Sequence, residues 1–284
     1  MIRKRVRATV HGAISIVNAL ATCSGSALGI SLRVIAEADL RAGEGIRSQT
    51  VNEKLIRNIV YNTIPKEILA ENSVCISVKS EIPMGFGLKS SSAVSDAVAL
   101  ACSKLVNEDV EDYVVLDRAI LASLDAGVTI TGAYDDSSAC YFGGFVVTNN
   151  RTHELIHHQE APHNLTAIIF IPKVTRRANM SKVDIMSGLF GEALKLARAG
   201  EYWEAMNLNG MLLSTCLSTE YEPVMKALQG GALAASISGN GPATAAVSNE
   251  EHIEVIKAAF AKFNGSVIVS KINNEKAMAE TIIG

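Results

Sequence analysis

Aromatic residues are scarce in this sequence, and its charges nearly balance. Phe, Trp and Tyr make up 5% of the 284 residues, and the formal net charge is −3. Proteins that bind single-stranded nucleic acid stack bases on aromatic side chains, and nucleic-acid binders in general carry basic surfaces that neutralise phosphates. Binding to an anionic membrane surface requires a similar excess of Lys and Arg. The composition therefore argues against both kinds of partner.

Long apolar runs and paired cysteines are also missing. No run approaches the roughly 18 apolar residues that a membrane-spanning helix needs, and the five cysteines include no Cys-x-x-Cys pair. An odd number of cysteines without metal-binding spacing predicts free thiols of a reducing compartment. The basic start of the chain precedes an apolar stretch that Ser15 and Asn18 interrupt, which disfavours a signal peptide. We expect a cytoplasmic protein.

The composition is that of a folded chain, with 48% hydrophobic and 19% charged residues. The pattern predicts strands at 2–10 and 27–38, joined by a segment rich in Gly, Ala and Ser. In the second half, helices over 183–199 and 202–217 alternate with short strands, the final one at 266–271. Helix pairs with interleaved strands indicate an α+β layer.

The segment 150–164 is polar, contains Pro162 and carries several histidines without a partner at metal-ligand spacing. It predicts a surface loop and a boundary between a domain at 1–155 and a second at 156–284. Asp96, in a helical pattern that begins at Ala93, is interpreted as an ordinary surface charge.

The most informative stretch reads Pro-Met-Gly-Phe-Gly-Leu-Lys-Ser-Ser-Ser-Ala, from Pro83 to Ala93. It lies between an alternating apolar run and a helical pattern, so it predicts a turn between a strand and a helix. Unpaired N–H groups at a helix N-terminus bind phosphate, and glycines let the backbone approach it. Leu88 stands where a Walker A loop needs glycine, and Ser90 stands where a dinucleotide fingerprint needs its third glycine. A capped helix start without a ligand is the competing interpretation.

A second stretch holds two adjacent carboxylates, Asp135 and Asp136, between Gly127 and the pair Gly143-Gly144. The surrounding Gly, Ser and Thr residues predict a loop. Adjacent aspartates in a loop act most often as turn formers or helix N-caps, whereas in an active site they serve as bases.

Two segments resemble the second and third motifs of the GHMP kinases (galactose, homoserine, mevalonate and phosphomevalonate kinases). The stretch 83–93 is similar to Pro-x-x-x-Gly-Leu-Gly-Ser-Ser-Ala-Ala, with Lys89 at the third glycine and Ser92 at the first alanine. Residues 238–243, Ser-Gly-Asn-Gly-Pro-Ala, resemble the third motif, Gly-x-Gly-Pro, which lies against the phosphate loop in that family. The first motif is degenerate, since Arg7 stands at the family's lysine position and the Glu-His pair is absent.

The resemblance implies a two-domain α+β fold. Its N-terminal α+β domain would contain a left-handed β-α-β unit, against the usual right-handed rule, and its C-terminal domain would be ferredoxin-like, with ATP between the two. The nucleotide site that it implies consists of Pro83, Met84, Gly85, Phe86, Gly87, Leu88, Lys89, Ser90, Ser91, Ser92, Gly239 and Gly241.

The likeness to mevalonate kinases implies a catalytic base seven residues before a Gly-Gly pair. Counting back from Gly143 gives Asp136, whereas counting forward from Thr131-Gly132 falls nearer Asp135; we favour Asp136. The same family places an acidic Mg²⁺ ligand eleven residues before the base, which gives Asp125. The resemblance further implies Ser91 as a second Mg²⁺ ligand and Lys89 as the cation that offsets charge on the transferred phosphoryl group.

Two sequence segments are similar to those of the archaeal type of shikimate kinase. They are His-Gly-Ala-Ile-Ser-Ile-Val-Asn-Ala near the start and Gly-Val-Thr-Ile-Thr-Gly-Ala-Tyr-Asp-Asp. This implies phosphoryl transfer from ATP to the 3-hydroxyl of shikimate, a step of aromatic amino acid biosynthesis. Arg176 and Arg177 are candidates for the substrate carboxylate, or else exposed charges that lead a helix. Homoserine kinase, quinate as an acceptor, a catalytically inactive ligand sensor on the same fold, and a homodimer all stay open.

Overall fold

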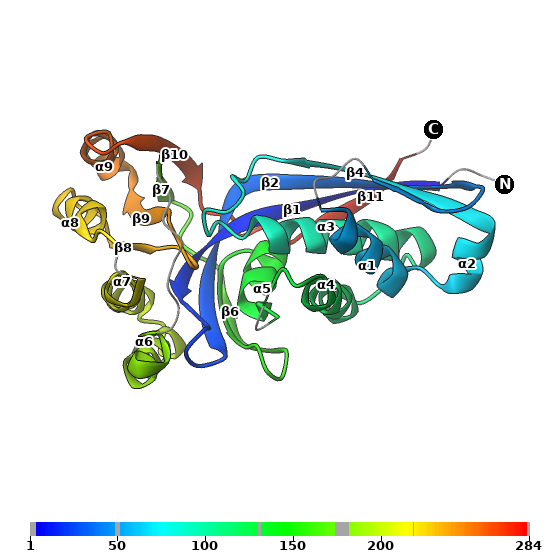
Figure 1. Ribbon diagram of the computed structural model, residues 1–284. Coiled ribbons are helices and arrows are strands. Elements are labelled where there is room, and N and C mark those ends of the chain that lie inside the picture. Colours follow the sequence, from blue (N-terminus) through cyan, green and yellow to red (C-terminus); the bar gives the residue numbers. More distant parts are fainter. Residues whose placement is uncertain (1–3, 49–51, 130–131, 174–181, 218, 283–284) are drawn as a thin grey trace.

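The computed structural model describes residues 4–48, 52–129, 132–173, 182–217 and 219–282. These residues form a large seven-stranded sheet and a smaller four-stranded sheet. Figure 1 shows the long strands β1 and β2 running from the large sheet toward the smaller one, with both chain ends at the far end of the large sheet. A single hydrophobic cluster contains residues of both sheets, among them Val10 and Ile169.

The large sheet is built around β1 and β2, which pair along most of their length. Strand β4 pairs with the second half of β2, and β5 pairs with its first half. The strands are β1 (Lys4–Val17), β2 (Ser24–Ala42), β3 (Ile46–Ser48), β4 (Asn72–Ser80), β5 (Phe145–Asn149), β6 (Glu154–Gln159) and β11 (Met278–Ile282). The path β11-β1-β2-β4-β3 is antiparallel except for the pair β3 and β4.

The two faces of this sheet differ because side chains alternate along each strand. In β1, Val6, Ala8 and Val10 are buried under the helices. On the other face, Arg5 and Arg7 both pair with Glu37 of β2. Arg7, at the family's first-motif lysine position, therefore belongs to the charged outer face of the sheet.

Helices cover the apolar face of the large sheet (Figure 1). They are α1 (Glu53–Thr63), α2 (Lys66–Glu71), α3 (Ser90–Val106), α4 (Asp112–Ala126) and α5 (Tyr134–Phe142). Helix α3 is rich in Ala and Ser and is buried on nearly every side. Its small side chains let it lie close to β1 and β2, which it contacts along with α1 and α4.

The smaller sheet has the order β10-β7-β9-β8, with every neighbouring pair antiparallel. Its strands are β7 (Leu165–Pro172), β8 (Ala234–Ile237), β9 (Thr244–Asn249) and β10 (Gly265–Lys271). Its helices are α6 (Ser187–Arg198), α7 (Tyr202–Leu217), α8 (Glu222–Gln229) and α9 (Ile253–Phe260), with short 3₁₀ helices η2 (Asp184–Met186) and η3 (Glu250–His252). The predicted helix at 202–217 is confirmed residue for residue.

Several predictions of local structure were wrong. The strands expected at 2–10 and 27–38 extend through most of the Gly/Ala/Ser-rich segment, because the small residues pack against α5 and the first half of β2 pairs with β5. The expected loop at 150–164 contains β6, which pairs with β5. A strand follows the one expected to be final, since β11 pairs with β1.

The domain boundary at 155 stays a prediction. It falls inside β6, and β11 brings the last described residues back to the large sheet. In the part of the chain that the structure describes, each helix is too short or too polar to cross a lipid bilayer.

Candidate active site

The predicted strand-to-helix turn lies between β4 and α3. Lys89 is the N-cap of α3 and has left-handed backbone angles, with φ of 63°, at the position where the family motif has glycine. Ser90, Ser91 and Ser92 form the first turn of the helix, whose leading N–H groups have no intrahelical partner. Together with Gly85 and Gly87 they line a cavity. We call these five residues the serine wall.

The loop between β8 and β9 packs directly on the serine wall. Ser238 Oγ donates to the carbonyl of Gly87 at 2.7 Å, and the N–H of Ala243 donates to the carbonyl of Phe86 at 3.4 Å. A Cβ atom on Gly87, whose φ is +78°, would overlap the carbonyl of Ser238. Glycine is therefore required at 87 for both its backbone angle and the close approach. The contact expected between the third motif and the phosphate loop is confirmed.

The second informative stretch contains a helix from Tyr134 to Phe142, so the prediction of a loop was wrong for the segment that holds the two aspartates. Helix α5 begins at Tyr134 after Ala133, whose φ of 51° turns the chain into it, and Asp135 and Asp136 stand in its first turn. The small and polar residues that predicted a loop pack instead against β1, β2 and β5. Carboxylates are favoured in the first turn of a helix by its dipole.

Lys89 connects the serine wall to α5. Its Nζ lies 2.7 Å from Asp136 Oδ1 and donates to Ser15 Oγ at 2.7 Å. The Lys89 side chain is 4% exposed. Burial lowers the pKa of this amine, but the charges of Asp136 and Asp135 and the hydrogen bond to Asp136 outweigh burial, so the pKa is raised above its usual value. Lys89 is thus a buried amine whose acidic neighbours favour its charged form.

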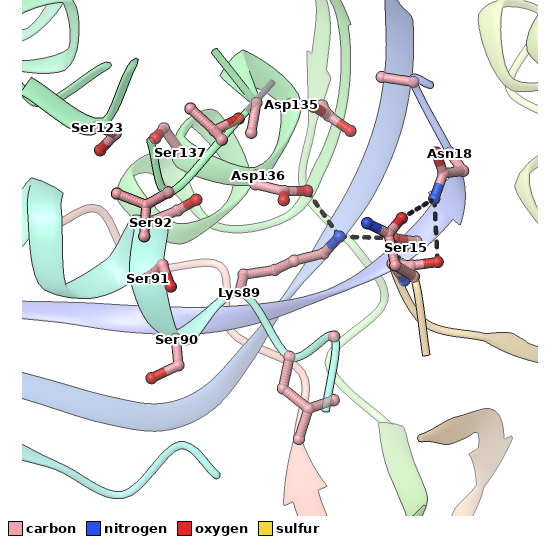
Figure 2. A pocket seen from close by; sticks show the side chains of 18 of the residues that line it. Ser15, Asn18, Lys89, Ser90, Ser91, Ser92, Ser123, Asp135, Asp136 and Ser137 are labelled. Carbon is pink, nitrogen blue, oxygen red and sulfur yellow. Dashed lines mark hydrogen bonds and ion pairs between the residues drawn. The ribbon is translucent and has the colours of Figure 1, made fainter. Parts of the chain in front are cut away.

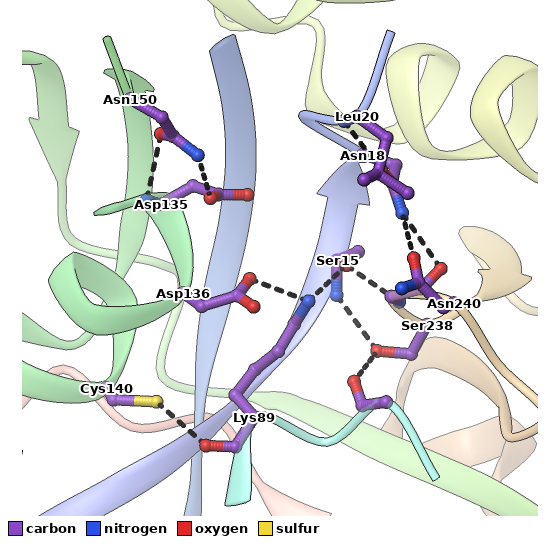
Figure 3. A network of polar contacts seen from close by, with 12 residues as sticks. Ser15, Asn18, Leu20, Lys89, Asp135, Asp136, Cys140, Asn150, Ser238 and Asn240 are labelled. Atoms are coloured by element: carbon purple, nitrogen blue, oxygen red, sulfur yellow. Dashed lines mark hydrogen bonds and ion pairs between the residues drawn. The ribbon is translucent and has the colours of Figure 1, made fainter. Parts of the chain in front are cut away.

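Ser15 holds the junction of three segments (Figure 3). Its Oγ accepts from Lys89 Nζ and also from the N–H of Gly239 at 2.9 Å. Its N–H donates to Ser238 Oγ at 3.1 Å. Asn18, the first residue after β1, donates from Nδ2 to the carbonyl of Gly239 at 3.0 Å. The contacts of Lys89 with Ser15 and Asp136, together with the bonds of Ser15 to the 238–239 turn, hold the ammonium in one place.

Asp135 is held by a different set of contacts from Asp136. Asn150 Nδ2 donates to Asp135 Oδ1 at 2.7 Å, and Asn150 Oδ1 accepts from the N–H of Asp135 at 3.2 Å. Burial, and next the charge of Asp136, raise the pKa of Asp135 to about 7. We call Asp135, Asp136, Lys89, Ser15 and Asn18 the carboxylate wall.

The two walls enclose a cavity of about 350 Å³. Figure 2 shows Ser90, Ser91 and Ser92 on one side and Ser15 and Asn18 on the other, with Lys89 reaching between them toward Asp136. Phosphate-binding donors, an ammonium and a carboxylate thus face one enclosed space. This arrangement suits the transfer of a phosphoryl group to a hydroxyl held at Asp136.

The predicted site residues do not all line the cavity. Gly85, Gly87, Leu88, Lys89, Ser90, Ser91, Ser92, Gly239, Gly241, Asp135 and Asp136 line it. Pro83, Met84 and Phe86 belong to the same loop but are not part of the lining. Asp125 is exposed in the last turn of α4 and is also outside the lining. Arg176 and Arg177 lie outside the described residues.

Asp96 is buried, so its interpretation as a surface charge was wrong. It is 0% exposed in α3, because this helix has α5 packed on the side that the sequence pattern left polar. Neither carboxylate oxygen makes a hydrogen bond of normal geometry among the described residues, although the Ser137 hydroxyl is close enough to interact with the carboxylate. Burial raises the pKa of Asp96 well above its usual value, the Ser137 hydroxyl opposes this, and the charge of Asp136 adds to it.

Sequence reasoning missed Ser15, Asn18, Leu20 and Asn240, which also line the cavity. Ser15 and Asn18 are 1% and 6% exposed; Ser15 lies within the apolar second half of β1, and Asn18 directly follows it. A buried polar residue in an apolar strand needs a partner, and this signal could have pointed to them.

Comparisons with known proteins agree with this geometry. Residues 54–144 match the family model of the GHMP kinases N terminal domain, and residues 192–266 match that of the GHMP kinases C terminal. A protein of Methanothrix thermoacetophila named shikimate kinase is 35% identical over 275 residues, covering 95% of this chain and 94% of its own.

The chain belongs to the GHMP kinases.

Within that family it groups with the archaeal shikimate kinases. A second relative of that name, from Pyrococcus furiosus, is 36% identical and covers 91% of this chain and 96% of its own. The fold is shared more widely: the structure of homoserine kinase from Cytophaga hutchinsonii superposes with a TM-score of 0.76 at 20% identity, over 97% of each chain. The predicted GHMP kinase fold is confirmed.

The cavity fits the nucleotide that a GHMP kinase uses. Three hydroxyls and a helix N-terminus supply donors for phosphate oxygens, and Lys89 supplies a positive charge. Among the described residues no cluster of three or more Asp, Glu, His or Cys side chains is arranged to hold a metal. Mg²⁺ in kinases is bound by one or two protein groups together with substrate phosphates, and the hydroxyl of Ser91 fits that sparse mode.

Proposed function

We propose that this GHMP kinase is a shikimate kinase, which transfers the γ-phosphoryl group of ATP to the 3-hydroxyl of shikimate. The acceptor is supported by the identity of 35–36% with shikimate kinases along more than nine tenths of the chain. The chemistry is supported by one observation above the others, the 2.7 Å contact between Lys89 and Asp136 inside the cavity that the serine wall lines.

The serine wall binds the triphosphate. Its hydroxyls and leading N–H groups would donate to the phosphate oxygens, and the dipole of α3 favours their charge. Ser91 would hold Mg²⁺, which would supply positive charge to neutralise the phosphates during transfer. Asp125 stays a prediction as a metal ligand, because its exposed carboxyl is outside the cavity lining.

The carboxylate wall holds the acceptor. Asp136 accepts a hydrogen bond from the 3-hydroxyl and takes its proton as the oxygen bonds to the γ-phosphorus and the bond to the ADP oxygen breaks. The contact with Lys89 fixes the orientation of the Asp136 carboxylate. A loose transition state depends more on orientation and charge neutralisation than on early proton removal. Lys89 stabilises the charge on the phosphoryl group in flight.

Three finer expectations accompany this proposal and remain predictions: a requirement for Mg²⁺, a cytoplasmic location and a homodimer. Arg176 and Arg177 also remain candidates for the substrate carboxylate. A catalytically inactive sensor is disfavoured, because the ammonium, the carboxylate and the serines all face the cavity.

The test is the release of ADP from MgATP with shikimate, quinate, homoserine or mevalonate supplied separately, with the product located by phosphorus NMR. We expect turnover with shikimate and a phosphate on its 3-oxygen. Turnover with homoserine alone would keep the mechanism and overturn the acceptor. ATP binding without turnover of any acceptor would favour the sensor.

A further inference from the structure

The two aspartates of α5 are neighbours in sequence, yet the structure supports them separately. Residues one apart on an α-helix point about 100° apart, so two adjacent carboxyls can face one cavity and reach different atoms. Asp136 forms an ion pair with Lys89, whereas Asp135 accepts a hydrogen bond from Asn150 (Figure 3). Both line the cavity. The mechanism uses Asp136 and assigns nothing to Asp135.

Asp135 is held in place by Asn150 and Thr148, which we call the bracket. Asn150, 2% exposed, contacts both its side chain and its backbone N–H. The orientation of the Asn150 amide is set in turn by Thr148, whose Oγ1 donates to Asn150 Oδ1 at 2.7 Å. Because Oδ1 receives these two donors, Nδ2 must face Asp135. Groups on β5 and just after it thus hold the carboxyl of α5 in one position.

Gly25 in β2 completes the bracket from the other side. A Cβ atom at this position would overlap Asp135 Oδ2. No positive φ is found at Gly25, so the backbone does not demand glycine here. The carboxyl of Asp135 therefore occupies the space that a side chain at residue 25 would fill.

Asp135 makes no ion pair among the described residues, because the ammonium of Lys89 goes to Asp136. A carboxyl that is 4% exposed and has no paired cation is costly to bury, which is explained if a ligand completes its hydrogen bonds. Its raised pKa of about 7 lets it donate or accept a hydrogen bond near neutral pH. A hydroxyl group of a ligand can pair with either the protonated or the ionised carboxyl, since it both donates and accepts hydrogen bonds.

Resting on the proposed function, we propose that Asp135 is a specificity-determining residue that hydrogen-bonds the 4-hydroxyl of shikimate, next to the 3-hydroxyl at Asp136. The pair of adjacent carboxyls then recognises a vicinal diol. An acceptor with one hydroxyl, such as homoserine, leaves Asp135 buried without its partner. Discrimination against a missing hydroxyl is strong when a buried group of the protein loses its partner.

The experiment compares kcat/KM for shikimate and 4-deoxyshikimate. We expect the natural protein to prefer shikimate by about 10- to 100-fold, the value of one hydrogen bond to a charged group. In Asp135→Ala the ratio of kcat/KM for the two acceptors should fall to about one, because the KM for shikimate rises. The KM for MgATP should be unchanged. Asp135→Asn, which keeps a polar group in the bracket, restores part of the preference.

Gly25→Ala provides a second test that leaves Asp135 in the chain. The added methyl would overlap the Asp135 carboxyl and lie close to Ala19 Cβ, with no backbone atom among its nearest neighbours. The carboxyl of Asp135 must therefore move, and we expect a folded protein with the same loss of preference. Gly191→Ala, on α6, is the matched control, since a Cβ atom there would meet nothing within 4 Å. Circular dichroism checks the fold of each variant.

The outcomes separate the two proposals. If the natural protein phosphorylates shikimate but does not prefer it to 4-deoxyshikimate, the role of Asp135 is overturned and the proposed function stands. The same holds if Asp135→Ala and Gly25→Ala slow both acceptors equally, because that marks a structural role. If Asp135→Ala does not fold, Gly25→Ala decides. Failure to phosphorylate shikimate at all overturns both proposals.

Discussion

The two walls of the cavity are built in different ways. The serine wall comes from one continuous segment, Gly85 to Ser92, and consists of backbone, hydroxyls and the start of α3. The carboxylate wall combines side chains from β1 and its following turn, from the N-cap of α3 and from α5. Local sequence can specify the first wall, whereas the second exists only once the chain has folded.

Charge divides the walls in the same way. The serine wall offers neutral donors, which bind any phosphate chain with little discrimination. The carboxylate wall holds two acids and one ammonium in a buried network, where small displacements are costly. Substitutions there should affect chemistry and acceptor choice, and substitutions in the serine wall should affect the nucleotide.

The largest effect is expected for Asp136→Asn. The amide keeps the shape but cannot take the proton of the acceptor hydroxyl, so kcat should fall about 10²- to 10⁴-fold. The KM for MgATP should change little, because the serine wall is intact. Steady-state kinetics measure both, with Asp109→Asn, an exposed residue outside the cavity, as the control. A loss confined to the KM for MgATP would contradict the division between the walls.

Lys89→Met should come next, with a loss in kcat of about 10²- to 10³-fold. The substitution removes the ammonium, leaves Asp136 unpaired and breaks the bond to Ser15. Methionine has a similar length and the same difficulty with a φ of 63°, so the backbone cost at this position is matched. If kcat survives and only nucleotide binding weakens, Lys89 acts with the serine wall instead.

Ser91→Ala should have a smaller effect on the other wall. Loss of one hydroxyl that contacts phosphate or Mg²⁺ should raise the KM for MgATP about tenfold, the value of a single hydrogen bond. The KM for shikimate should stay within about twofold. Ser266→Ala, exposed on β10, serves as the control. An equal rise in both KM values would show that the walls are not independent.

Asp96→Asn tests the carboxyl buried behind both walls, and its effect should appear in stability. The folded-state pKa of Asp96 is raised, so its contribution to stability is complete below the unfolded pKa of about 3.9 and is lost as pH rises toward the folded value. Asn at position 96 does not titrate, so the variant keeps its stability as the pH rises. Its advantage in unfolding free energy should therefore grow with pH, at most by about 1.4 kcal/mol per pH unit.

Urea unfolding at pH 5 and pH 8 measures this difference, with Asp109→Asn as an exposed control. An advantage of Asp96→Asn that is the same at both pH values would show that Asp96 is already ionised in the folded protein. Kinetics at the same pH values show whether the buried charge also affects Asp136.

The sequence by itself determined the serine wall and the family. A change of period from two to 3.6, two glycines and three serines are local features, and the helix N-terminus that they predict forms from local interactions. The strand-to-helix turn and α7 followed from such patterns, whereas the contact of the third motif followed from the resemblance to the GHMP kinases.

Tertiary structure decided the carboxylate wall. The sequence could not show whether Asp135 or Asp136 meets Lys89, because that depends on how α5 is rotated over β1 and β2. It read α5 as a loop and Asp96 as a surface charge, since burial by distant segments leaves no mark on a residue's neighbours in the chain. Ser15, Asn150 and Gly25 acquire their roles from partners far away in sequence, and only the packed fold brings them together.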